Sequence, residues 1–173
     1  MNLLFEVPST FLLSGEYFVT LEDGRGVAIA TAPYVNVEVI PNKNRHAELH
    51  CITITGDQQR RVFDLRSDSN IDPLLRSVCD IWHRHIGSVQ EIPGAAIRID
   101  SSALFSTDGS KRGYGSSAAA CVALCTALAH LDRRTRELDR RQLSQISIAA
   151  HRKFQGGHGS GYDIMTAIMG GAG

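Results

Sequence analysis

The sequence predicts an α+β fold built around one hydrophobic core. Its 173 residues suffice for a single domain of ordinary size. Extended apolar stretches dominate the first half of the chain, and apolar residues at helical spacing dominate the second half. Strands and helices separated in this way are typical of a sheet with helices on one side. We therefore expect a mixed sheet with helices packed on one face.

The expected strands lie mainly in the first half of the chain. We predict them over residues 3–7, 11–14, 26–32, 34–40, 48–54, 60–65 and 95–100. The fourth segment alternates valines with polar residues, as a half-buried strand does. Pro8 is expected to separate the first two segments. The fifth and sixth flank Gly56-Asp57, which predicts a hairpin.

Four helices are expected, and start and stop signals mark several of their ends. We predict them over residues 73–86, 118–131, 140–154 and 164–169. Asp72-Pro73 places an N-cap residue before a proline at the first helical position, and Gly87 ends that helix. The second helix is almost entirely Ala, Leu, Val and Cys, which predicts burial on most sides. Asp139 is expected to cap the third helix.

Charge and composition exclude several classes of function. The chain has 18 acidic and 18 basic residues, so no overall field attracts nucleic acid or membranes. The charged stretch 132–141 is expected to be a solvated loop between helices. No basic segment precedes the apolar start of the chain, and no apolar stretch approaches the length of a membrane span. We therefore expect a cytoplasmic protein that binds neither nucleic acid nor membranes.

The cysteines and the tryptophan are expected in the core. Cys121 and Cys125 lie one helical turn apart, which is half of a metal site, but no third ligand with fitting spacing is nearby. Packing of reduced thiols is the better interpretation. Trp82 falls on the apolar stripe of the first helix, so we expect it to be buried.

Two glycine-rich loops, at residues 113–117 and 156–161, each precede a predicted helix. The first turn of a helix has unpaired N–H groups and a positive dipole end, and both attract phosphate. Glycine allows the backbone to approach an anion closely. We therefore expect an anion site, and the alternative is a pair of ordinary turns capped by serine.

Neither loop has the spacing of a Walker loop, a dinucleotide-binding turn or a nucleophile elbow. A serine hydrolase built around Ser160 therefore has little support.

Three sequence motifs resemble the signatures of the GHMP kinases. KRGYGSSAAA, at residues 111–120, resembles the family pattern P-x-x-x-G-L-G-S-S-A-A. GSGYDIMTAIMGG, at residues 159–171, resembles the stretch S-G-x-D followed by paired glycines. Residues 7–32 resemble the N-terminal signature, P-G-K and then G-E-[YH]. The lysine at 111 and Glu-Tyr at 16–17 favour the phosphomevalonate kinase branch.

The resemblance implies a fold and an activity. The fold would be that of the N-terminal, ATP-binding domain over residues 1–173, similar to ribosomal protein S5 domain 2, with the C-terminal domain outside this chain. The activity would be ATP- and Mg²⁺-dependent phosphorylation of phosphomevalonate to diphosphomevalonate in the mevalonate pathway of isoprenoid biosynthesis. The substrate would thus be a small phosphorylated or hydroxylated acid.

Two alternatives stay open. The chain could be a mevalonate kinase or another GHMP kinase. It could also be a non-catalytic nucleotide-binding or partner subunit, because Pro8-Ser9-Thr10 stands where the family has P-G-K and because family members are about twice as long. A partner chain or the C-terminal domain would then complete the site.

The resemblance also implies residue roles. Asp163 would act as base or charge stabiliser, although it could be a plain helix cap. Lys153 would supply the missing catalytic cation, with Arg152 as the alternative. Ser117 would bind Mg²⁺. The nucleotide-binding residues would be Lys111, Gly113, Tyr114, Gly115, Ser116, Ser117 and Ala118. The substrate-binding residues would be Ser14, Gly15, Glu16, Tyr17, Arg112, His151, Ser160 and Gly161. The alternative for each lysine or arginine here is a solvated surface charge.

Overall fold

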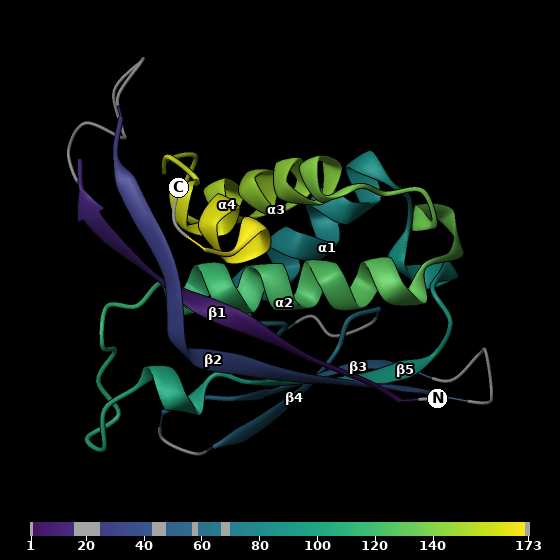
Figure 1. Cartoon of the computed structure of the whole chain (residues 1–173). Helices are drawn as coiled ribbons and strands as arrows, with labels where there is room; N and C mark the ends of the chain where they lie inside the picture. Colours follow the sequence, from purple (N-terminus) through teal and green to yellow (C-terminus); the bar gives the residue numbers. More distant parts are fainter. Residues whose placement is uncertain (1, 16–24, 43–47, 57–58, 67–69, 172–173) are drawn as a thin grey trace.

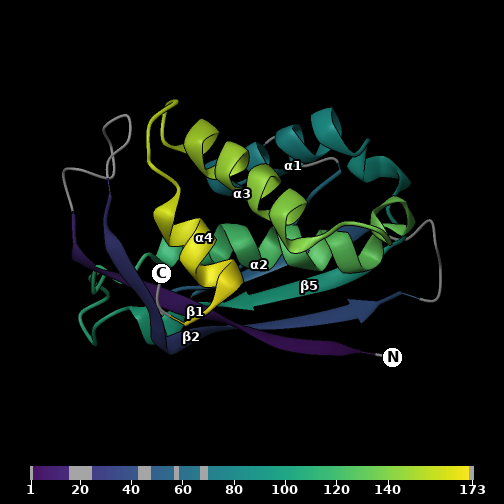
Figure 2. The ribbon, with the colours of Figure 1, turned by 45° about the horizontal axis from the view of Figure 1, so that its top comes forward.

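The computed structural model describes residues 2–15, 25–42, 48–56, 59–66 and 70–171. Within them, five strands form one sheet in the order β1-β2-β5-β3-β4. The strands are β1 (Leu3–Ser14), β2 (Val27–Pro41), β3 (Leu49–Ile54), β4 (Arg60–Asp64) and β5 (Ala95–Asp100). The α-helices all lie on one face of this sheet (Figures 1 and 2). The predicted α+β class is confirmed.

The sheet is mixed, as expected. Strand β2 pairs antiparallel with both β1 and β5, and β3 pairs antiparallel with β4, which confirms the predicted hairpin. Strand β3 pairs parallel with β5. A parallel pair needs a crossover, and the helix between β4 and β5 provides it.

The prediction that Pro8 separates two strands is wrong. Strand β1 continues through Pro8, and only the pairing register with β2 shifts between Pro8 and Ser9. Strand β1 is at the edge of the sheet, where a residue without an N–H group can be accommodated. Strand β2 likewise spans the two segments that were expected as separate strands.

Four α-helices follow the predicted order: α1 (Pro73–His85), α2 (Ser116–Leu131), α3 (Arg140–Phe154) and α4 (Tyr162–Met169). Asp72 caps α1 through the N–H groups of the first turn. Asp139 and Gln142 form a capping box at the start of α3. Helices α2 and α4 each begin two residues earlier than predicted, directly after a glycine in the left-handed conformation.

Helix α2 is the centre of the core. It packs on the sheet and contacts each of the other three helices (Figure 1). Ten of its 16 residues are buried, including Cys121 and Cys125. The expected core role of both cysteines is confirmed, and the described residues contain no cluster that could hold a metal ion. None of the helices in the described ranges is long and apolar enough to cross a membrane.

The charged stretch after α2 is only partly solvated, so that prediction needs correction. Trp82 is fully buried, as expected, and its Nε1 donates to Asp132 Oδ2 at 3.1 Å. Arg134 donates to the same carboxylate, with Nη2 2.7 Å from Oδ2. Asp132 is therefore buried and anchors a short 3₁₀ turn at Arg133–Thr135 to helix α1.

Candidate active site

The glycine loop at residues 113–117 lies where β1 meets the start of α2. Gly115 is the N-cap residue of α2 and has φ 67°. The N–H group of Thr10 in β1 donates to the carbonyl oxygen of Tyr114 at 3.2 Å. A β-carbon at Gly115 would lie 2.6 Å from Thr10 Oγ1. The loop is thus tied to the strand, and this contact requires glycine.

Asp163 meets the loop from the other side. It is the second residue of α4, and Gly161 is the N-cap residue with φ 82°. The Asp163 β-carbon lies 3.9 Å from the position that a β-carbon of Gly115 would take. In Figure 1, α4 lies over the end of α2 that adjoins β1. Three segments that are distant in sequence therefore converge at Thr10, Gly115 and Asp163.

The convergence brings two helix starts together. Ser116 and Ser117 form the first two positions of α2, and Asp163 stands in the first turn of α4. The N–H groups of a first helical turn have no intrahelical acceptor, and the helix dipole is positive there. Phosphate oxygens are suitable acceptors for such groups.

Ser117 has a partner on helix α3. Its Oγ lies 3.1 Å from Nε2 of His151, which is only 3% exposed. Burial lowers the pKa of His151, and the Asp163 carboxylate opposes that shift without cancelling it. Burial therefore favours the neutral form of the imidazole beside Ser117.

The cations near the first loop are exposed. Lys111 forms an isolated antiparallel bridge with Phe105, and the Arg112 N–H group donates to the Leu104 carbonyl oxygen at 3.2 Å. Both residues are exposed. A β-carbon at Gly113 would meet nothing within 4 Å. The loop therefore has open space on its outer side.

The two cations near the second loop have other partners. Lys153 Nζ lies 2.6 Å from Asp80 Oδ2 on helix α1. Arg152 donates from Nε to the Gly159 carbonyl oxygen at 2.7 Å, and from Nη2 to that of Ser160 at 3.2 Å. Arg152 thus braces the loop backbone. The predicted catalytic role of Lys153 gains no support from its ion pair with α1.

The remaining substrate-side predictions that the structure describes lie at the end of β1 and in the second glycine loop. Ser14 ends β1 and is exposed, and a side chain at Gly15 would clash with the carbonyl oxygen of Arg25. Glu16 and Tyr17 lie outside the described residues. Ser160 is half-buried, and a β-carbon at Gly161 would press on Ile148 at 2.9 Å.

A sequence model described as GHMP kinases N terminal domain matches residues 74–171, which is more than half of the chain. The chain belongs to the GHMP kinase family. Among curated proteins, it is similar to a phosphomevalonate kinase from Saccharolobus solfataricus, with 33% identity over 97 residues. That match covers 56% of this chain and 29% of the relative.

Solved GHMP kinases share the fold. The mevalonate kinase of Methanococcus jannaschii superimposes with TM-score 0.70 at 20% identity, over 99% of this chain and 52% of that one. A Streptococcus pneumoniae phosphomevalonate kinase, in complex with phosphomevalonate and AMPPNP, gives 0.69 at 17% identity, over 96% and 47%. The Lactococcus lactis galactokinase gives 0.70 at 13%, over 98% and 42%. The chain spans about half the length of these structures.

Two features of this GHMP kinase domain went beyond the sequence prediction. Thr10 was noted only as a departure from P-G-K, yet it is 4% exposed and contacts the loop at Gly115. Its position in the N-terminal signature, where the family has the lysine of P-G-K, is the sequence feature from which a place at the site could have been predicted. His151 was expected to bind substrate, but its described partner is Ser117. No spacing rule predicts that contact, because it depends on how α2 and α3 pack.

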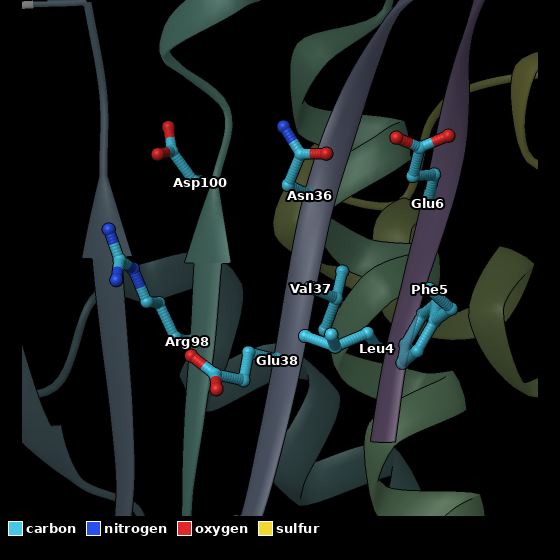
Figure 3. A pocket seen from close by; sticks show the side chains of 8 residues that line it. All are labelled: Leu4, Phe5, Glu6, Asn36, Val37, Glu38, Arg98 and Asp100. Atoms are coloured by element: carbon cyan, nitrogen blue, oxygen red, sulfur yellow. The ribbon is translucent and has the colours of Figure 1, made fainter. Parts of the chain in front are cut away.

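A concave region of the GHMP kinase domain lies on the other face of the sheet (Figure 3). It has a volume of about 470 Å³, and the side chains around it come from β1, β2 and β5. It is lined by Leu4, Phe5, Glu6, Asn36, Val37, Glu38, Arg98 and Asp100. It includes no residue of the glycine loops and stands apart from the convergence at Asp163.

Proposed function

We propose that this GHMP kinase domain forms the nucleotide-binding half of an ATP- and Mg²⁺-dependent phosphotransferase whose acceptor is phosphomevalonate and whose product is diphosphomevalonate. The observation that carries the proposal is the convergence of Gly115, Ser117 and Asp163 at the starts of two helices. The similarity to the Saccharolobus solfataricus phosphomevalonate kinase supports this acceptor over others.

The loop suits the phosphates of a nucleotide. The N–H groups of residues 115–117 lie at the start of α2 and have no intrahelical acceptors. Space is open around Gly113, and a β-carbon at Gly115 would intrude on Thr10. Lys111 and Arg112 are exposed on the segment that leads into the loop, where they can balance phosphate charge.

The oxygen atoms at the site suit Mg²⁺. Ser117 offers a hydroxyl oxygen, the ligand type that binds Mg²⁺ beside nucleotide phosphates in phosphate-binding loops. Bound ATP would supply the phosphoryl group, and Mg²⁺ would neutralise its charge during transfer. The chain itself would position these groups, because phosphoryl transfer depends on alignment and charge neutralisation more than on covalent chemistry.

Asp163 is assigned to the acceptor. Its Oδ1 already accepts the Ile164 N–H at 2.9 Å, which fixes the carboxylate against the first turn of α4. The second oxygen is then the one that orients the acceptor oxygen or takes its proton. Lys153 is left out of this assignment because Asp80 pairs with it.

A second candidate function rests on Thr10. A hydroxyl cannot neutralise charge beside Asp163 as the lysine of P-G-K would. A nucleotide-binding subunit without turnover would tolerate this replacement. A kinase would need cations from Lys111, Arg112 or a part of the protein beyond the described residues.

Both candidate functions are tested by measuring ADP formation with the full-length protein. The acceptors are phosphomevalonate, mevalonate, homoserine and galactose, and binding of MgATP is measured in parallel. Turnover restricted to phosphomevalonate supports the proposal, and turnover on another acceptor reassigns the substrate. Binding of MgATP without turnover on any acceptor favours the non-catalytic subunit. Absence of nucleotide binding contradicts both functions.

A further inference from the structure

The seam between α2 and α3 carries a polar contact that reaches into the proposed nucleotide site. Ser117 on α2 and His151 on α3 meet there, with Oγ and Nε2 3.1 Å apart. One turn deeper, Cys121 Sγ lies 3.5 Å from the carbonyl oxygen of Ser147 and donates to it. Both side chains of the deeper pair are buried. The two contacts hold the helices in one register.

We propose that His151 is a positioning residue: its Nε2 accepts the proton of the Ser117 hydroxyl and turns the oxygen lone pairs toward the metal–nucleotide side. This inference rests on the proposed function, because it assigns Ser117 to the Mg²⁺-nucleotide. It replaces the predicted role of His151 in substrate binding.

The geometry favours a supporting role over direct contact with substrate. His151 is 3% exposed, so hardly any of its surface is available to an acceptor molecule. Ser117 is half-buried, and so more exposed than His151, and it stands in the first turn of α2. His151 therefore lies behind Ser117.

The chemistry explains why an acceptor is needed there. A serine hydroxyl binds a cation through its oxygen lone pairs, so its proton must point elsewhere. A neutral imidazole nitrogen takes that proton without adding negative charge to a site already close to Asp163. Groups that orient metal ligands in this way strongly affect metal affinity.

A purely structural role makes a different prediction. His151 also lies against Phe154, with ring centroids 6.2 Å apart. If the ring only filled space, its replacement would change stability but would not affect Mg²⁺-bound and Mg²⁺-free nucleotide differently.

The test compares nucleotide binding with and without Mg²⁺ in the full chain. Dissociation constants for AMPPNP are measured by calorimetry in Mg²⁺ and in EDTA. We expect His151→Leu to weaken binding about 10-fold or more in Mg²⁺, the range known for residues that support metal ligands, and to leave binding in EDTA nearly unchanged. His130→Leu, at the exposed far end of α2, is the matched control and should behave as wild type.

A pair of polar variants covers the case in which His151→Leu does not fold. The side chain of His151→Gln is long enough to reach Ser117 and accept its proton, whereas that of His151→Asn is not. We expect Gln to restore the Mg²⁺-dependent gain in affinity and Asn to lack it. In a Ser117→Ala background, His151→Asn should cause no further loss, because coupled residues are not additive.

The outcomes separate the two proposals. Equal Mg²⁺ dependence in wild type, His151→Asn and His151→Gln overturns the positioning role alone. If His151→Asn weakens nucleotide binding further in the Ser117→Ala background, the positioning role is overturned as well. A wild-type protein that binds no AMPPNP in Mg²⁺ overturns the proposed function, and this inference with it.

Discussion

Asp163 and the glycine loop make separable contributions at the level of single residues. The Asp163 β-carbon lies 3.9 Å from the position that a β-carbon of Gly115 would take, and the Asp163 carboxylate accepts the Ile164 N–H of α4. The loop contributes backbone N–H groups at the start of α2. A change in the carboxylate should therefore affect chemistry, and a change in the loop should affect binding.

The variant Asp163→Asn tests the first of these. The amide keeps the size of the side chain, and its oxygen can still accept the Ile164 N–H, so the start of α4 should be preserved. We expect turnover to fall by about 100-fold or more, the usual contribution of a general base, while the dissociation constant for MgATP changes little. Turnover and binding are measured on the same preparation. Full turnover in the variant would reduce Asp163 to a structural residue of the first turn.

The variant Gly115→Ala tests the second. A left-handed residue with a β-carbon costs about 1 kcal/mol of stability, and here the β-carbon also meets Thr10 Oγ1 at 2.6 Å. We expect MgATP binding to be lost. Gly109→Ala is the matched control, because Gly109 has φ 80° and open space around it. The control should lose stability in thermal melts but keep its affinity, and equal affinities in both variants would contradict the assignment of the loop.

Much of the candidate site was predictable at this scale, because its glycines, serines and aspartate stand in contiguous motifs. The partners of these residues were not. The contact between Ser117 and His151 and the ion pair between Lys153 and Asp80 each join two helices. Such contacts depend on helix packing, which sequence periodicity does not specify.

At the level of elements, the buried Asp132 links the end of α2 to α1. Burial raises the pKa of Asp132, but hydrogen bonds from Arg134 and Trp82 outweigh it, and the net pKa lies below the usual range. A group with a depressed folded pKa contributes stability above its unfolded pKa, near about 3.9, and this contribution is lost as the pH falls through the folded value.

The variant Asp132→Asn should therefore be less stable than wild type at neutral pH, and the difference in the free energy of unfolding should be smaller in acid. We expect a deficit of about 1–3 kcal/mol at pH 7, typical of a lost charged hydrogen-bond partner, because Arg134 loses its ion pair. The deficit should shrink between about pH 4 and pH 2. Urea unfolding at several pH values measures it. A deficit that is constant with pH would mean that the charge of Asp132 contributes nothing.

Helices and strands were predicted well where a local sequence rule fixes them, and poorly where contacts with another element fix them. The caps at Asp72 and Asp139 are local, and both helices begin as expected. The continuity of β1 through Pro8 depends on its position at the edge of the sheet, which no local rule specifies. Asp132 was read as solvated because its neighbours in sequence are charged, although its partner Trp82 comes from another helix.

At the level of the whole molecule, the reactivity of two cysteine thiols can show how often the core opens. Cys51 is fully buried, and burial raises its pKa far above the ordinary range. Burial also raises the pKa of Cys79 to about 12. Both thiols belong to elements that enclose the core, Cys51 to β3 and Cys79 to α1.

We expect Cys51 to react with iodoacetamide at pH 8 at least about 100-fold more slowly in the native protein than in urea, because only the thiolate is reactive and access to this buried thiol is blocked. Cys79 is half-buried, so its slower reaction should come from its raised pKa. Mass spectrometry of the labelled peptides gives the rates. Fast labelling of Cys51 in the native protein would show that the sheet and helices separate readily.

The N–H group of Thr10 donates out of the sheet, to the loop carbonyl of Tyr114. Its deuterium uptake should therefore depend on how often the loop detaches from β1. A nucleotide that holds the loop in place should slow uptake at Thr10, while uptake at the paired residues of β2 stays constant. Amide exchange with and without MgATP, followed at single-residue resolution, measures this difference. A sheet amide would then act as an internal reporter of ligand occupancy, without a label and without turnover.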